Sequence, residues 1–110
     1  MASGKINSSY VLETIAYTKA TTKIPDGDYG FSLKRCGNVI EIAGWFHNTT
    51  QITDGETLFT FPYMELAGGF CPVVKGTSTG VCEYRKTSFV SRSTLAVGYW
   101  NITTLHIFVN

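Results

Sequence analysis

The sequence predicts an all-β fold, and more finely an antiparallel, jelly-roll-like β-sandwich of about eight short strands. Three observations point to this class. Apolar residues recur with a period of two, the runs that contain them are rich in β-branched and aromatic residues, and Gly, Pro and Asn separate the runs at fairly even spacing. No long segment carries a convincing helical pattern.

Strands are expected where apolar and polar side chains alternate between turn signals. In chain order these segments are residues 11–17, 29–35, 38–46, 57–62, 70–75, 81–85, 94–100 and 103–109. The first admits one amphipathic helical turn as well as a strand, and the strand is the preferred interpretation. In the third, Ile40 and Ile42 share one face. In the fourth, Pro62 marks the strand end because proline cannot donate to a ladder.

Turn-forming residues separate these segments. Pro25 presets φ and Gly27 permits a positive φ, so a turn is expected around them. A tight connection at Cys36-Gly37 precedes the third segment. The polar loop over residues 48–56 contains the strong turn dipeptide Asp54-Gly55 and leads into the fourth segment.

The last segment carries information about the surroundings of the chain. Leu105, Ile107 and Val109 point to one side of the strand, whereas His106 and Phe108 point to the other. An outward-facing Phe108 needs cover, and a neighbouring subunit would supply it. We therefore expect an oligomer.

The chain has 110 residues, a length typical of one domain with one hydrophobic core. We expect the polar residues 1–9 to form a linker stub and residues 10–110 to form a single β-sandwich domain. Apolar residues make up 44% of the chain, whereas charged residues make up 15% against about 25% in typical globular domains. So few charges indicate that part of the surface is covered by another molecule.

The charge and hydropathy of the chain exclude two classes of partner. The formal net charge is +1 and the isoelectric point is near 7.7, whereas nucleic-acid-binding domains carry a clear basic excess. No window approaches the roughly eighteen consecutive apolar residues of a membrane-spanning helix. We expect neither nucleic-acid binding nor membrane insertion.

The three cysteines, Cys36, Cys71 and Cys82, are odd in number and lack a close CxxC spacing. That pattern argues against a zinc site and against a disulfide framework. Buried free thiols are expected, because unpaired cysteine packs like a small hydrophobic residue. In an oxidising setting, a Cys71–Cys82 bridge across a hairpin is the alternative.

The sequence contains no nucleophile elbow, Walker loop, dinucleotide-binding glycine motif or HExxH motif, so we expect no enzyme activity and no cofactor. We expect no metal either. His47 and His106 lie in different elements, which disfavours a two-histidine metal site. Asp26 and Asp28 flank Gly27, and a turn explains them more simply than a calcium ion.

Three Asn-x-Ser/Thr triplets begin at Asn7, Asn48 and Asn101. Such triplets are glycosylation signals only in a eukaryotic secretory setting, and they arise often by chance in a chain rich in Ser and Thr. We take them as loop markers, which places Asn48 and Asn101 in turns.

Aromatic and polar side chains occur together in three places. The runs are Trp45-Phe46-His47-Asn48, Glu83-Tyr84-Arg85-Lys86 and Gly98-Tyr99-Trp100-Asn101. Sugars are bound by flat aromatic faces that pack on their C–H groups, while a few polar groups satisfy the hydroxyls. Alternatively, Trp45 and Trp100 plug the end of the core. The predicted saccharide-binding residues are Trp45, His47, Asn48, Tyr84, Arg85, Tyr99, Trp100 and Asn101.

The order of turn glycines and strand ends resembles a known family. A Gly37-to-Phe46 strand is followed by a polar loop, an Asp54-to-Pro62 strand, an extended Phe70-to-Val74 segment and a closing strand pair. Over residues 29–110 this succession is similar to the head domains of phage and prophage tail proteins. The chain departs from the family pattern at residues 63–69, which replace the short turn expected after Pro62.

The resemblance implies a compact β-sandwich, usually homotrimeric, that binds host cell-wall saccharides or teichoic-acid-like polymers. It also implies other tail or baseplate proteins as partners and a place at the phage tail tip of a virion, acting extracellularly. The family has no fixed sugar-binding motif, so the predicted site residues rest on their chemistry alone. Two alternatives stay open: a structural trimerisation domain of a baseplate or fibre without a ligand, and a secreted β-sandwich adhesin.

Overall fold

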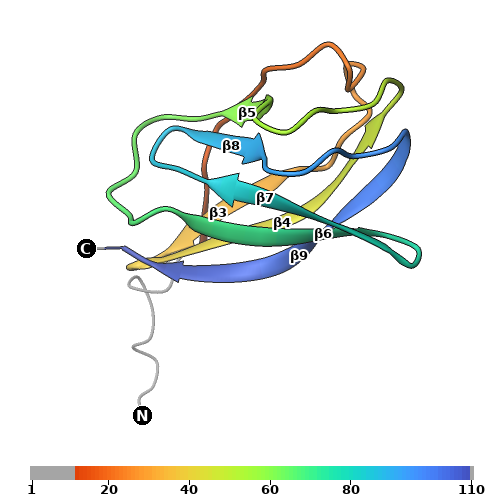
Figure 1. The fold of residues 1–110 in the computed structure, drawn as a ribbon. Helices are drawn as coiled ribbons and strands as arrows, with labels where there is room; N and C mark the ends of the chain where they lie inside the picture. Colours follow the sequence, from red (N-terminus) through yellow and green to blue (C-terminus); the bar gives the residue numbers. More distant parts are fainter. Residues whose placement is uncertain (1–11, 110) are drawn as a thin grey trace.

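The computed structural model describes residues 12–109, which form one antiparallel sheet of nine strands (Figure 1). The strands are β1 (Leu12–Thr14), β2 (Thr18–Lys19), β3 (Ser32–Cys36), β4 (Val39–Asn48), β5 (Thr57–Thr60), β6 (Gly69–Lys75), β7 (Ser78–Tyr84), β8 (Ser88–Ser91) and β9 (Gly98–Phe108). Their order across the sheet is β1-β3-β4-β9-β6-β7-β8-β5-β2. The predicted all-β, antiparallel class is confirmed. The finer prediction of a jelly-roll-like sandwich is not confirmed, because hydrogen bonds join all these strands into one sheet.

The sheet curls into a half-barrel, so strands far apart in the sheet order face each other across the core (Figure 1). Phe31, just before β3, stacks on Phe59 of β5 with ring centroids 4.3 Å apart and an interplanar angle of 3°. Phe31 also contacts Phe89 of β8 at 5.1 Å. The core therefore lies on the concave side of the curled sheet.

The segment that carries β1 and β2 links the two edges of the sheet. Its first part pairs with β3, where the Ile15 amide donates to the Leu33 carbonyl at 2.9 Å. Its second part pairs with β5, where the Ala20 amide donates to the Leu58 carbonyl at 2.8 Å. One segment thus covers two sheet edges that would otherwise be open to pairing with another chain. Of the single predicted strand over residues 11–17, only Leu12–Thr14 is a strand; the chain then switches partner and forms β2 at Thr18–Lys19, beyond the predicted range.

The inner face of the sheet supplies the core, as strand periodicity requires. Ile40 and Ile42 are fully buried and share one face of β4, which confirms that prediction. Cys71 and Cys82 lie opposite each other on β6 and β7, buried and unbridged, and Cys36 is half-buried. Burial raises the pKa of the Cys71 thiol to about 11. Burial also raises the pKa of the Cys82 thiol, and the nearby Cys71 raises it further.

Two strand predictions are wrong. Residues 94–100 and 103–109 do not form separate strands, because the chain continues through Asn101 as the long strand β9. The short strand β8 was not expected at all, since its four residues begin and end with Ser and show no alternation of their own. Residues 1–9 of the expected linker stub, the sequon at Asn7, and residues 10, 11 and 110 of the expected domain lie outside the described residues.

The predicted polar loop over residues 48–56 is partly a core element. Asn48 is the buried last residue of β4 and Asn101 lies within β9, so the prediction that both lie in turns is wrong. Ile52 is also buried and forms an isolated β-bridge with Leu95. Between residues 12 and 109, no helix is long and apolar enough to cross a membrane.

Candidate functional site

Four of the eight predicted site residues gather on the outer face of the sheet. Trp45 and His47 lie on β4, and their partners across the strand pair are Asn101 and Tyr99 of β9. Alternate residues of a strand point to opposite faces, so these four side chains share one face. We call this group, Trp45, His47, Tyr99 and Asn101, the aromatic strip.

The rings of the aromatic strip lie against one another and leave surface open to solvent. The His47 imidazole stacks on the Tyr99 ring with centroids 4.0 Å apart and an interplanar angle of 4°. Trp45 lies 6.0 Å from Tyr99, tilted by 39°. Tyr99 is 59% exposed and Trp45 is also exposed. The strip thus offers flat ring surface beside the exposed Asn101 side chain.

Residues 28–30 form a short extended segment that pairs with β4 and helps to position the strip. The His47 amide donates to the Asp28 carbonyl at 3.0 Å, and the Gly30 amide donates to the Trp45 carbonyl at 2.8 Å. The Trp45 indole lies directly over Gly30, where any side-chain carbon would clash with the indole nitrogen. Glycine at this position therefore sets where the indole can lie.

Asp28 is a functional candidate that the sequence analysis missed. The Pro25–Asp28 turn is closed by a 3.1 Å hydrogen bond from the Asp28 amide to the Pro25 carbonyl, with Gly27 at φ +80°. This turn brings the Asp28 carboxylate to Nδ1 of His47, and the two groups form an ion pair or hydrogen bond. The residues are nineteen positions apart, so only the pairing of residues 28–30 with β4 could have revealed the contact.

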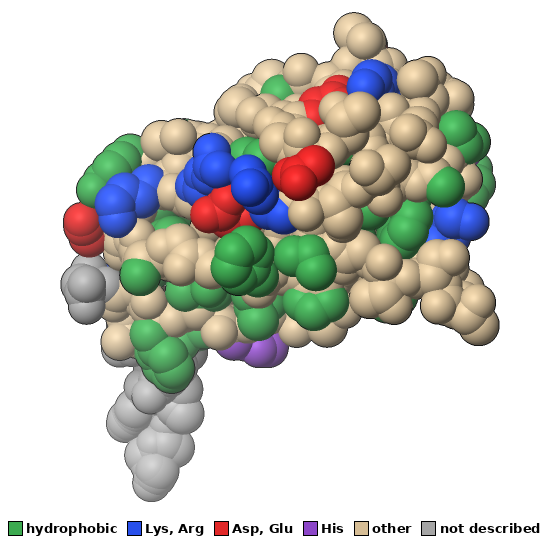
Figure 2. Space-filling view, viewed as in Figure 1, with side chains coloured by type: hydrophobic (Ala, Val, Ile, Leu, Met, Phe, Trp, Pro, Cys, Tyr) green, Lys and Arg blue, Asp and Glu red, His purple; other side chains and the backbone are tan. Residues whose placement is uncertain are grey.

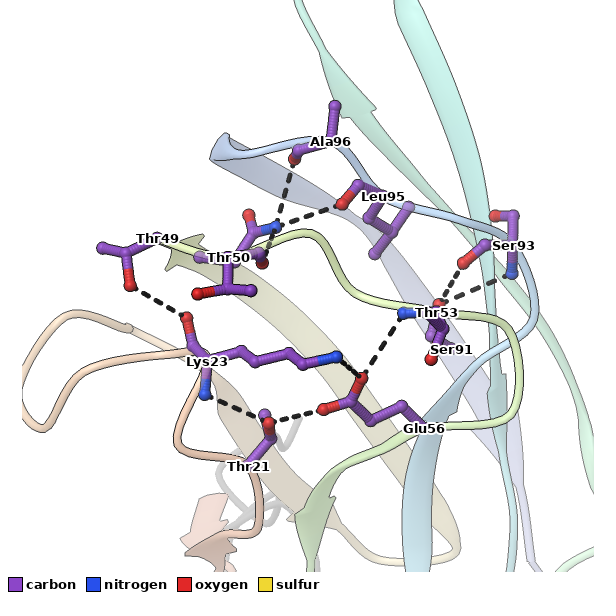
Figure 3. Close-up of polar contacts among 11 residues, drawn as sticks. Thr21, Lys23, Thr49, Thr50, Thr53, Glu56, Ser91, Ser93, Leu95 and Ala96 are labelled. Atoms are coloured by element: carbon purple, nitrogen blue, oxygen red, sulfur yellow. Dashed lines mark hydrogen bonds and ion pairs between the residues drawn. The ribbon is translucent and has the colours of Figure 1, made fainter.

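Two of the predicted site residues belong to the core instead. Trp100 is 2% exposed, and its indole N–H donates to the Ala96 carbonyl at 2.9 Å. The buried Asn48 amide donates to the carbonyls of Thr50, Leu95 and Ala96 at 3.1 to 3.2 Å (Figure 3). Both predictions are therefore corrected: these side chains point inward because they alternate with the aromatic strip along β4 and β9.

Tyr84 and Arg85 do not join the aromatic strip. Tyr84 is half-buried on β7 and packs against the core, and Arg85 is exposed and bonds to Glu83 at 2.9 Å. Tyr84 pairs with Gly69, five residues along β6 from the Val74 that pairs with Asn101. That spacing offsets Tyr84 from the strip by about 17 Å along the strand direction. These two predicted site residues therefore form no common surface with the other four.

A second polar cluster joins the segment at Thr21 and Lys23 to the one at Thr53 and Glu56 (Figure 3). The Glu56 carboxylate accepts hydrogen bonds from Thr21 Oγ1 at 2.6 Å, Lys23 Nζ at 2.8 Å and the Thr53 amide at 3.4 Å. Burial raises the pKa of Glu56, but the bonds from Lys23, Thr21 and Thr53 outweigh it, so the pKa lies below its usual value. Both oxygens of the Glu56 carboxylate therefore have partners within the cluster, which indicates a structural role.

The described residues offer no evident metal centre. No three His, Cys, Asp or Glu side chains among residues 12–109 are grouped as a metal ion requires. Asp26 pairs with Lys19 at 2.7 Å, whereas Asp28 pairs with His47, so the two carboxylates of the turn have different partners.

Comparison of the chain with models of protein families, with curated proteins and with solved structures gives no match in any of the three. A function must therefore be argued from the geometry of the strip and from the pattern of the sequence.

Proposed function

We propose that this protein is a non-catalytic phage tail head domain that binds a saccharide of the host cell surface through the aromatic strip. The observation that carries saccharide binding is the parallel stack of His47 on the 59%-exposed Tyr99, with Trp45 beside it. Exposed flat rings of this kind pack against the apolar C–H faces of sugar rings. A folded core does not need Tyr99, because the neighbouring Trp100 fills the inner face at this position.

Polar groups at the edge of the rings suit the hydroxyls of a sugar. Asn101 is exposed, and neither its amide nor the Tyr99 hydroxyl makes a hydrogen bond to another residue between 12 and 109. An amide supplies both donors and acceptors, and a phenol supplies one of each. The strip therefore combines an apolar wall with a few placed polar groups, the usual composition of a saccharide site.

The tail context of this proposal rests on the resemblance over residues 29–110. Within it, the half-barrel corresponds to the jelly-roll-like sandwich of a head domain, located at the tail tip of a virion and acting outside the host cell. Other tail or baseplate proteins are the partners that this context supplies. Weak binding at each site would be strengthened by several copies in one particle.

We also propose that the chain forms a homotrimer through apolar parts of the outer face. Phe70 is 64% exposed and is followed on the same side of β6 by Pro72 and Val74, and Phe108 of β9 is 75% exposed. Figure 2 shows hydrophobic side chains gathered over β6 and β9, next to a band of charged side chains. Exposed apolar patches of this kind mark interaction sites. The same side chains favour the second candidate function, a structural trimerisation domain without a ligand.

Light scattering of the purified protein tests the homotrimer. The expected mass is three times that of the chain, and Phe70→Lys together with Phe108→Lys should reduce it because buried charges oppose association. Tyr63→Lys is the control, since Tyr63 is similarly exposed and lies in the separate segment before β6. A stable monomer of the unaltered chain would contradict the homotrimer and leave saccharide binding to be judged separately.

A glycan array tests saccharide binding. The unaltered protein should bind at least one bacterial surface glycan, and Tyr99→Ala or His47→Ala should abolish binding while folding is retained. Tyr63→Ala is the matched control, because Tyr63 is 62% exposed and lies outside the aromatic strip. Failure of the unaltered protein to bind any bacterial glycan would leave the trimerisation domain as the better proposal.

A further inference from the structure

The hydrogen-bonding state of His47 restricts what the aromatic strip can bind. The Asp28 carboxylate lies at Nδ1 of His47, and a carboxylate accepts hydrogen bonds. In the neutral imidazole the proton therefore belongs on Nδ1, and Nε2 is an acceptor. The stack on Tyr99 fixes the plane of the ring, so the direction of the Nε2 lone pair is fixed as well.

A ligand at Nε2 must bring a hydrogen-bond donor. A sugar hydroxyl has one, whereas an ionised carboxylate or phosphate has none. Protonation of His47 would let Nε2 donate, but the ion pair with Asp28 would then offset the new charge. An acidic ligand would also approach the Asp28 carboxylate, and like charges oppose binding.

The charged groups around the strip also disfavour an acidic ligand. The groups that face His47 are Asp28, from the segment along β4, and Tyr99, from β9. Lys75 lies over the inward-facing Trp100, with Nζ 6.0 Å from its ring centroid. Four other cations in residues 12–109 have carboxylate partners of their own, namely Lys19 with Asp26, Lys23 with Glu56, Arg85 with Glu83, and Arg92 with Asp54. None of these pairs supplies a cation to the strip.

We infer that the aromatic strip takes neutral sugars and rejects acidic sugars and phosphate polymers, and that Asp28 is the residue that sets this preference. The inference rests on the proposed saccharide function and decides between the two ligand classes that the family resemblance implies. Asp28 acts through its charge and through the proton that it holds on His47.

Matched pairs of immobilised sugars test the preference. Galactose with galacturonic acid, and glucose with glucuronic acid, differ at one carbon, and poly(glycerol phosphate) stands for the phosphate polymers. Near neutral pH, at least one neutral sugar should be retained about tenfold more than its acidic partner. Asp28→Asn should narrow that ratio, because it removes the charge but keeps an acceptor for His47. Asp26→Asn, which alters the neighbouring carboxylate paired with Lys19, should leave the ratio unchanged.

Nitrogen NMR of the His47 imidazole supplies a readout that needs no sugar. The expected neutral tautomer carries its proton on Nδ1, and a proton on Nε2 would overturn the inference. Retention of an acidic sugar or of poly(glycerol phosphate) above the neutral sugars would overturn it too, while leaving saccharide binding in place. Retention of none of these probes would overturn the inference, and failure on the glycan array as well would overturn the proposed function.

Discussion

Neighbouring residues of β4 and β9 have opposite roles in this protein. Trp45, His47, Tyr99 and Asn101 form the outward aromatic strip, whereas Asn48 and Trp100, which alternate with them, are buried and hydrogen-bonded to loop carbonyls. Each face has one Trp and one Asn. Residue type therefore does not decide which side chain holds the fold and which is free for a ligand; position in the strand does.

The largest difference in the free energy of unfolding is expected between alanine variants of Tyr99 and Trp100. Trp100→Ala should lower the free energy of unfolding by about 3–5 kcal/mol, because it empties a fully packed site and removes one of the two hydrogen bonds that the Ala96 carbonyl accepts. Tyr99→Ala should lower it by only about 0.5 kcal/mol, since the ring is mostly exposed. Urea unfolding of both variants measures the difference. Equal losses of stability in the two variants would show that the inner face is no more important for folding than the outer face.

Replacing Asn48 should cost more stability than replacing Asn101, as for Trp100 and Tyr99, but the difference should be smaller. Asn48→Ala should cost about 1–3 kcal/mol, because the carbonyls of Leu95 and Ala96 lose a buried donor. Asn101→Ala should change stability by no more than about 0.5 kcal/mol. Thermal unfolding of the pair provides the measurement. A larger loss for Asn101 would mean that its side chain has a structural partner in the folded protein.

Glu56 and Asp54 should differ in how they affect the pH dependence of stability. The lowered pKa of Glu56 means that its contribution to stability is fully present above the usual pKa of about 4.3 and is lost as pH falls through the lower value of the folded state. Glu56→Gln should remove that pH dependence and cost about 1 kcal/mol near neutral pH. Asp54→Asn, at an exposed carboxylate two residues away, is the control. Urea unfolding measured as a function of pH below 5 tests this role of Glu56. If the stabilities of Glu56→Gln and of the unaltered chain fell in parallel with pH, that role would be contradicted.

Much of the strand content could be predicted because alternation is a local signal. Ile40 and Ile42 show it, and both are buried as expected. The division of the aromatic residues between the two faces could not be predicted in the same way. Trp45 and Trp100 each stand next to another aromatic residue, so either member of the pair could face inward. A register shift between Ile42 and Gly44 also interrupts the alternation along β4.

The remaining misses depend on contacts between distant parts of the chain. Asp28 reaches His47 only because residues 28–30 pair with β4. Asn101 looked like a turn residue, yet pairing with both β4 and β6 holds it in the middle of β9. Four of the eight predicted site residues therefore meet on one face, and the partner that fixes His47 became visible only in the folded chain.

The central claim is that the outer face of β4 and β9 binds the sugar while the inner face holds the fold. Retention of folded Tyr99→Ala on a glycan that the unaltered protein binds, measured beside Trp100→Phe, tests this most directly. The account predicts that Tyr99→Ala keeps its stability and loses retention, whereas Trp100→Phe loses stability and keeps retention. Undiminished retention of Tyr99→Ala would contradict it.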